Sequence, residues 1–105
     1  MLQINAAGFA EAIKSDSPVF IKIFASWCSP CKLLAPIIEK ISEVNKGVAF
    51  LEMDVDKAGE TPNQLQITNV PTMVMFRAGA EVGRLTGFNQ ELVVQNFIDK
   101  YAFQA

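Results

Sequence analysis

Two segments of the chain are almost continuously apolar, a pattern typical of strands that are buried on both faces. Residues Pro18–Ala25 read PVFIKIFA and residues Val48–Val55 read VAFLEMDV, and both are rich in β-branched and aromatic side chains. Such strands belong to parallel or mixed sheets, because helices cover both sides of these sheets. Lys22 interrupts the first segment and Glu52 the second, so each strand carries a charge where an apolar side chain is expected.

A long helix is predicted directly after the first strand. Its apolar residues recur every three or four positions, the spacing of a helix with one buried face; they are Cys31, Leu34, Ile38 and Ile41. The helix therefore starts near the two cysteines of the chain. Pro36 lies inside it and is expected to kink it, because proline lacks the amide hydrogen and its ring crowds the preceding turn.

The C-terminal third of the chain predicts a hairpin and a final helix. Thr72–Phe76 and Glu81–Leu85 read as two strands, and the short connection at Ala78-Gly79 indicates a tight turn between them. Glu91–Tyr101 has the pattern of a helix, with Asn89 as its predicted N-cap.

Two weaker elements complete the predicted order. Phe9–Lys14 is expected to form a short amphipathic helix, and Lys57–Leu65 a polar helix or turn. With an initial strand to which no residues are assigned, strands and helices alternate up to the hairpin. This order predicts an α/β fold with a mixed sheet and helices on both faces. Residues 1–105 are expected to form one domain, since the chain has no room for a second core.

Charge and hydropathy argue against several classes of partner. Lys and Arg number 9, Asp and Glu 11, and the net charge of -2 shows no basic stripe, so a nucleic-acid partner is not expected. No apolar run approaches the length of a membrane-spanning helix, so a membrane partner is not expected either. The first residues lack the basic start and apolar block of a signal peptide, which predicts a cytoplasmic location unless a signal has been removed.

The chain has no histidine and two cysteines, Cys28 and Cys31. The lack of histidine excludes Cys–His and Ser–His–Asp catalysis and the HExxH zinc site. A disulfide between residues this close closes too short a loop to stabilise the fold much. Two thiolates are half of a tetrahedral metal site, so neither metal nor cofactor is expected, a cluster bridged by two chains being the remote alternative.

The cysteines lie where the predicted strand passes into the predicted helix. A helix N-terminus carries a partial positive charge and free amides, which stabilise a thiolate. Cys28 is expected to be the exposed nucleophile that forms a mixed disulfide, and Cys31, deeper and one turn on, to resolve it. Pro30 suits the first turn, where a missing amide hydrogen costs nothing.

The segment WCSPCK resembles the WCGPCK active site of the thioredoxin family. The resemblance extends along most of the chain, through Ala25, Pro36, Asp54, Asp56, Val70-Pro71-Thr72, Gly79 and Gly87. It implies the thioredoxin fold, and a thiol–disulfide oxidoreductase that reduces protein disulfides through a dithiol–disulfide cycle. Thioredoxin reductase is then the expected electron donor, and a monomer the expected state.

The sequence departs from the family pattern at three positions. Ser29 replaces the usual glycine between the cysteines, where the family associates the intervening pair of residues with the redox potential. Asn69 stands where a glycine is common, a mild change because asparagine tolerates a left-handed backbone. Lys22 stands where these proteins carry a buried aspartate.

The resemblance also implies a substrate-binding surface. Its expected members are Trp27, Ser29, Pro30, Val70, Pro71, Gly87 and Phe88. An extended substrate is expected to lie against a cis Val70-Pro71 bond, with Trp27 and Phe88 flanking it. The alternatives are a core role for Trp27, an ordinary trans bond before Pro71, and a purely conformational role for Gly87.

Lys22 and Glu52 are predicted to meet beneath Cys31. Alternation places Lys22 on the face of Phe20 and Phe24, and a buried charge is tolerable only when it is paired. The family resemblance implies a lysine where this chain has Glu52, so the usual pair of charges is reversed. Both residues are therefore candidate catalytic residues that move the proton of Cys31. In the alternative, Lys22 extends to solvent and never meets Glu52.

Two other functions stay open from the sequence alone. The same fold serves disulfide oxidases and isomerases, which donate disulfides. It also serves as a non-catalytic binding subunit of larger assemblies, in which the cysteines are dispensable.

Overall fold

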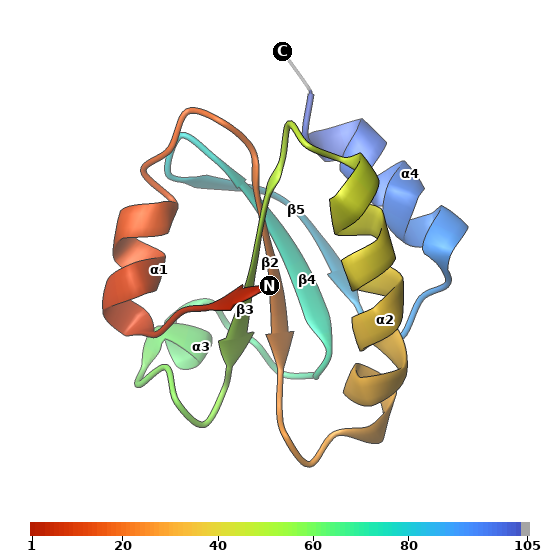
Figure 1. Ribbon diagram of the computed structural model, residues 1–105. Helices are drawn as coiled ribbons and strands as arrows, with labels where there is room; N and C mark the ends of the chain where they lie inside the picture. The colour runs from red at the N-terminus through yellow and green to blue at the C-terminus, as the bar shows by residue number, and fades with distance from the viewer. Residues whose placement is uncertain (104–105) are drawn as a thin grey trace.

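Figure 1 shows the computed structural model, which describes residues 1–103. Over these residues the strands form one mixed sheet in the order β1-β3-β2-β4-β5. Their bounds are Leu2–Gln3 for β1, Val19–Phe24 for β2, Ala49–Asp54 for β3, Thr72–Arg77 for β4 and Ala80–Thr86 for β5. β1 and β2 run parallel to β3, whereas β4 is antiparallel to both β2 and β5. The α/β prediction with a mixed sheet is confirmed.

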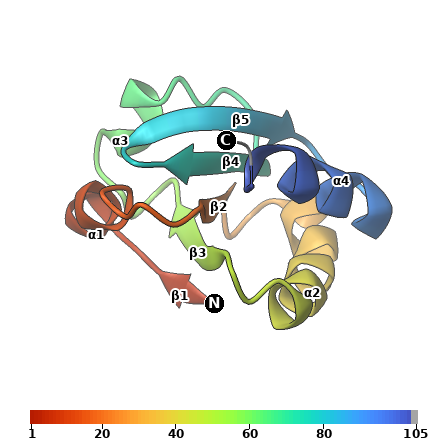
Figure 2. The same ribbon diagram turned by 90° about the horizontal axis from the view of Figure 1, so that it is seen from above.

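Helices cover both faces of this sheet, as predicted (Figures 1 and 2). α1 (Ala6–Ala12) and α3 (Thr61–Gln64) lie on one face, and α2 (Ser29–Val44) and α4 (Glu91–Tyr101) on the other. The long helix α2 runs through Pro36 without ending there. Its predicted inward positions are all buried; they are Cys31, Leu34, Ile38 and Ile41.

The two sides of β2 face two separate hydrophobic layers. Phe20 packs with apolar residues of α2 and α4, whereas Ile21 and Ile23 pack toward α1 and α3. The alternation of side chains along a strand produces this division, and burial on both faces explains why β2 is apolar apart from Lys22. The site described below lies where β2 ends and α2 begins.

Two of the predicted elements have different bounds in the structure. α1 begins at Ala6, ahead of the predicted Phe9, because the Asn5 side chain accepts a hydrogen bond from the Gly8 amide (3.0 Å) and caps the helix. Within the predicted Lys57–Leu65 element only α3 is helical.

The N-cap predicted for the last helix is wrong. Gln90 occupies that position, and it makes no capping hydrogen bond through its side chain. The Asn89 side chain instead donates to the carbonyls of Thr86 and Gly87, both at 3.2 Å. Gly87 has a φ of 79°, and the turn that this left-handed backbone makes directs Asn89 back to the end of β5.

Candidate active site

Cys28 and Cys31 form a disulfide at the N-terminus of α2. Cys28 is the N-cap residue, and its Sγ accepts a hydrogen bond from the Cys31 amide at 3.2 Å. One helical turn separates the two residues, whose Cα atoms are 5.3 Å apart. Ser29 and the predicted first-turn Pro30 open the helix, so the chain loses no hydrogen bond at the proline. The helix therefore directs free amides at the sulfur of Cys28, as a stabilised thiolate requires.

The expected difference in exposure between the two cysteines is wrong for this disulfide form. Each residue is 4% exposed. The cause is the loop before β4, which places the carbonyl oxygen of Val70 3.6 Å from Cys28 Sγ. Ala25 and the partly buried Phe24 also pack against the two cysteines.

The peptide bond between Val70 and Pro71 is cis, as the family resemblance implies. The amide of Gly87 donates a 2.7 Å hydrogen bond to the Pro71 carbonyl and fastens this loop to the segment after β5. Gly87 therefore has both a conformational role, through its positive φ, and a bonding role. Phe88 follows it and is 43% exposed at the surface.

Trp27 lies at the surface rather than in the core, being 69% exposed. Its indole Nε1 donates to Asp56 Oδ2 at 3.2 Å, and the Asp56 amide donates to the buried Asp54 carboxylate at 2.9 Å. Neither aspartate was predicted to have a role in the site. The signal available was the DxD spacing at the end of the strand Val48–Val55.

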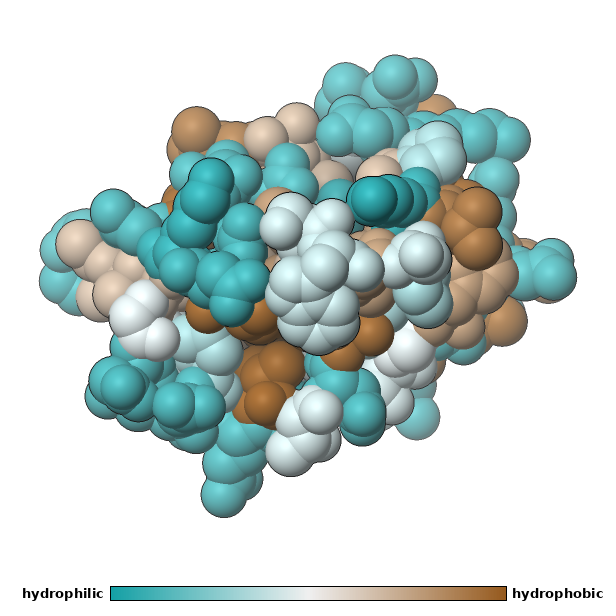
Figure 3. All heavy atoms as spheres, turned by 90° about the horizontal axis from the view of Figure 1, so that it is seen from below, coloured by the Kyte–Doolittle hydropathy of each residue, from teal (hydrophilic) through white to brown (hydrophobic). Residues whose placement is uncertain are grey.

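A pocket of about 260 Å³ lies beside Trp27 and Val70. The loop before β4 supplies much of its lining, including Ile67, Thr68 and Asn69. Figure 3 views the end of the molecule at which α2 begins, where apolar side chains reach the surface between polar ones. Ile67 and Thr68 were not predicted from the sequence, because the lining of a pocket depends on how distant loops meet.

Lys22 and Glu52 meet, as predicted. They are register partners on β2 and β3, and Lys22 Nζ lies 3.4 Å from Glu52 Oε2. The side chain of Lys22 is 6% exposed and that of Glu52 is 20% exposed, so Lys22 does not extend to solvent. Both residues line a cavity of about 200 Å³ together with Cys31. The resolving sulfur and the ion pair therefore share one small space.

Residues 1–103 contain no group of three or more Cys, Asp or Glu side chains placed to hold a metal ion. In the same range, no helix has the length and apolar character needed to span a bilayer.

The thioredoxin family model matches residues 1–100 of the chain. The chain is 37% identical over 91 residues to thioredoxin-1 of Saccharomyces cerevisiae, a match that covers 87% of this chain and 88% of the relative. Thioredoxin of Echinococcus granulosus is 34% identical over 88 residues, a match that covers 84% of this chain and 82% of that relative.

Solved structures agree with the sequence relatives. Thioredoxin of Plasmodium falciparum superposes with a TM-score of 0.91 at 32% identity, over 97% of this chain and all of that one (100%). Thioredoxin of Fasciola hepatica superposes with a TM-score of 0.89 at 30% identity, over 96% of this chain and 99% of that one. The family model, these relatives and a redox-active cysteine pair at the start of α2 together identify the chain as a member of the thioredoxin family, a protein-disulfide reductase of the thioredoxin type.

Proposed function

We propose that Cys28 is the attacking cysteine and Cys31 the resolving one, in a cycle that reduces disulfides of extended protein segments. The observation that carries this assignment is the position of Cys28 Sγ, which caps α2 and lies 3.6 Å from the Val70 carbonyl. A substrate strand beside Val70 and Pro71 therefore brings its disulfide to Cys28 first. The other proposed members of the substrate-binding surface are Trp27, Ser29, Pro30, Gly87 and Phe88. Trp27 lines a pocket with Val70, Ser29 and Pro30 stand between the two cysteines, and the Gly87 amide bonds to the Pro71 carbonyl next to Phe88.

The cycle has two exchange steps. The Cys28 thiolate attacks one sulfur of the substrate disulfide, which forms a mixed disulfide and releases the first substrate thiolate. The Cys31 thiol then loses its proton and attacks Cys28 Sγ. This second attack forms the Cys28–Cys31 disulfide and releases the second substrate thiolate. Two electrons pass to the substrate, and the protein is left with the Cys28–Cys31 disulfide.

Glu52 and Lys22 are proposed to act in the second step. The cavity that they share with Cys31 admits water, so the Glu52 carboxylate can accept the Cys31 proton directly or through a water molecule. The Lys22 ammonium then stabilises the thiolate that remains. Because a stabilised thiolate favours the reduced form, charged Lys22 makes the protein a weaker reductant.

A flavin-dependent thioredoxin reductase is the proposed electron donor. One relative, from Mycobacterium leprae, is a bifunctional thioredoxin reductase/thioredoxin, 37% identical over 84 residues that are 18% of its own length. That protein joins the two activities in one chain, which supports a reductase as the partner here. We further propose that a single domain carries the whole cycle as a monomer, in a reducing compartment such as the cytoplasm, where dithiols persist.

A trapping experiment tests the assignment. Cys31→Ser is expected to accumulate mixed disulfides with protein substrates through Cys28, because the resolving attack is lost. The matched control Cys28→Ser is expected to trap nothing and to have no disulfide reductase activity. Trapping through Cys31 in the control would reverse the two roles. Full activity of both variants would indicate a binding subunit in which the cysteines are dispensable.

A further inference from the structure

The ammonium group of Lys22 has two close neighbours. On β3, Glu52 Oε2 lies 3.4 Å from Lys22 Nζ. On β2 itself, the centre of the Phe24 ring lies 5.3 Å from the same nitrogen. A cation within about 6 Å of an aromatic ring centre is attracted by the negative face of the ring. The cation is therefore held by a carboxylate and by an aromatic ring.

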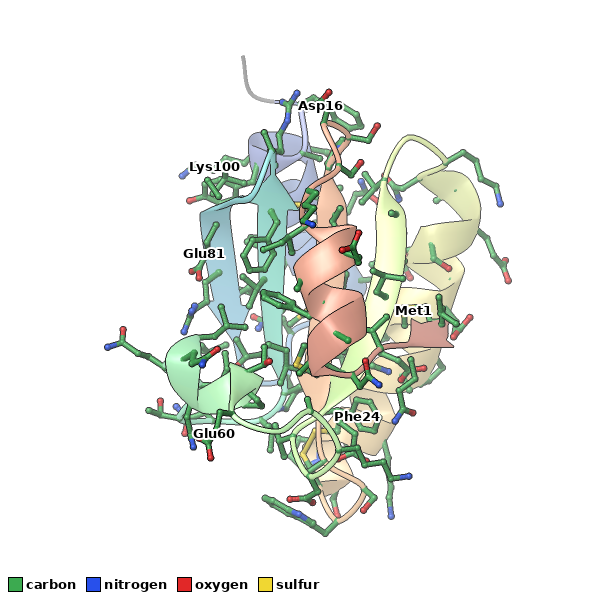
Figure 4. The ribbon with its side chains drawn as sticks, turned by 90° about the vertical axis from the view of Figure 1, so that its left-hand side faces the viewer. Met1, Asp16, Phe24, Glu60, Glu81 and Lys100 are labelled. Atoms are coloured by element: carbon green, nitrogen blue, oxygen red, sulfur yellow. A yellow bond between two sulfur atoms is a disulfide. The ribbon has the colours of Figure 1, made fainter. Side chains whose placement is uncertain are left out.

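Phe24 also reaches the disulfide. Residues two apart on a strand share a face, so Phe24 and Lys22 both face α2. The Phe24 side chain lines the same cavity as Lys22, Glu52 and Cys31, and it packs against the cysteines. Figure 4 shows Phe24 close to the yellow disulfide bond at the lower end of the molecule.

The ring matters because the ion pair is not closed to water. The Glu52 side chain is 20% exposed and that of Lys22 is 6% exposed. A lysine side chain is long and flexible. If the partly hydrated Glu52 carboxylate were its only partner, the Lys22 ammonium could turn toward solvent together with that carboxylate. Phe24 lies nearer the cysteines along β2, so its attraction keeps the ammonium at the Cys31 side of the pair.

We propose that Phe24 is a positioning residue, which holds the Lys22 ammonium in the cavity beside Cys31 and so sets the ease with which the Cys31 thiolate forms. The proposal rests on the proposed function, in which Cys31 resolves the mixed disulfide. It assigns to Phe24 a role in the second exchange step that acts through Lys22.

Charged groups flank the ammonium on two elements. Glu52 faces it from β3, with the buried Asp54 two residues further along the same face of that strand, and Lys32 of α2 lines the same cavity. On the other side of β2 the register partner of Lys22 is Met73 of β4, which is fully buried and uncharged. The titrating group that senses the cation is thus the Cys31 thiol, with Glu52 opposing the effect of the cation.

The test is a thiol titration of the reduced, full-length protein, read by the ultraviolet absorbance of the thiolates. Lys22→Met is expected to raise the midpoint for Cys31 by about one pH unit, since a nearby cation lowers a thiol pKa by about that much. Phe24→Leu is expected to raise it by about half a unit, a threefold change that corresponds to the loss of one cation–ring contact. The reduction potential becomes more negative in both variants.

Two matched variants separate positioning from packing. Phe24→Trp keeps an aromatic face and is expected to retain the wild-type midpoint. In a Lys22→Met background, Phe24→Leu is expected to change nothing further, because no cation remains to be held. An equal shift from Phe24→Leu with and without Lys22 would overturn the proposal and show that the ring acts only by packing. No shift from Phe24→Leu in the wild type would overturn it as well.

Failure of the proposed function and failure of the positioning role give different results. Loss of trapping by Cys31→Ser would refute the order of the two cysteines, whatever Phe24 does. Intact trapping and intact disulfide reduction, with no dependence of the Phe24 effect on Lys22, would refute only the positioning role.

Discussion

The two faces of the central sheet are packed differently. On the side of α1 and α3, the buried residues of β2, β3 and β4 are apolar except for Thr72, and they include Ile21, Ile23 and Phe76. On the side of α2 and α4, the apolar layer around Phe20 gives way near the disulfide to the pair of Lys22 and Glu52.

The ion pair is a local departure from apolar packing rather than a feature of the whole sheet. Strands β2 and β3 carry it on one face, whereas the same strands pack their other face with hydrocarbon alone. A buried ion pair adds little stability compared with apolar residues of similar volume, because both charges lose hydration. The pair lies in the cavity of Cys31, where the proposed proton transfer would need it.

The largest loss of stability is expected from a substitution on the side of the sheet that α1 and α3 cover. Phe76 is buried and packs edge-to-face on Phe9, with ring centres 5.3 Å apart. Phe76→Ala is expected to lower the free energy of unfolding by about 3–5 kcal/mol, because it leaves a cavity. Denaturant unfolding measures the loss, and the disulfide-exchange rate of the folded protein is expected to stay unchanged. A slowed exchange rate would mean that the two faces are coupled.

The next largest effect is expected from Glu52→Met. This change leaves the Lys22 ammonium buried without its carboxylate, and it is expected to cost about 3 kcal/mol in unfolding free energy. Lys22→Met leaves Glu52, which can reach water, and is expected to cost only about 1 kcal/mol. Equal losses in the two variants, by denaturant unfolding, would contradict the asymmetry in burial.

The double variant Lys22→Met/Glu52→Met sharpens the comparison. It replaces both charges with apolar side chains, and its free energy of unfolding is expected to lie within about 1 kcal/mol of the wild-type value, since neither charge is left unpaired. Its second exchange step is expected to be slower, because no group remains to accept the Cys31 proton. Stability losses that simply add, with an unchanged rate, would show that the residues are neither coupled nor catalytic.

The smallest effect is expected at Arg84 of β5, outside both layers. Its guanidinium donates to the Leu65 carbonyl at 2.7 Å and to Glu81. The hydrogen bond to Glu81 raises the pKa of Arg84, so the cation persists at all working pH values. Arg84→Met is expected to cost about 1 kcal/mol. Arg84→Lys is the control, and it is expected to recover part of the loss; a full-sized loss in Arg84→Lys would assign the effect to the forked geometry alone.

The local sequence was sufficient to predict the elements that carry the chemistry. The apolar run of β2, the helical spacing after Cys28 and the first-turn Pro30 predicted a strand that passes into a helix at the cysteines. Strand alternation placed Lys22 toward α2, and the predicted contact with Glu52 followed because an unpaired buried charge is costly. The cis bond before Pro71 came from the family resemblance rather than from periodicity.

The tertiary structure alone decided features that depend on segments far apart in the chain. Cys28 is covered by the carbonyl of Val70, which is 42 residues away in the sequence. The position of Cys28 at the start of α2 therefore does not by itself determine how exposed its sulfur is. The bond from Trp27 to Asp56 arises in the same way. Local sequence governs backbone conformation through short-range sterics and hydrogen bonds, whereas burial is set by whichever distant loop packs on a site, and residue type and spacing do not encode that contact.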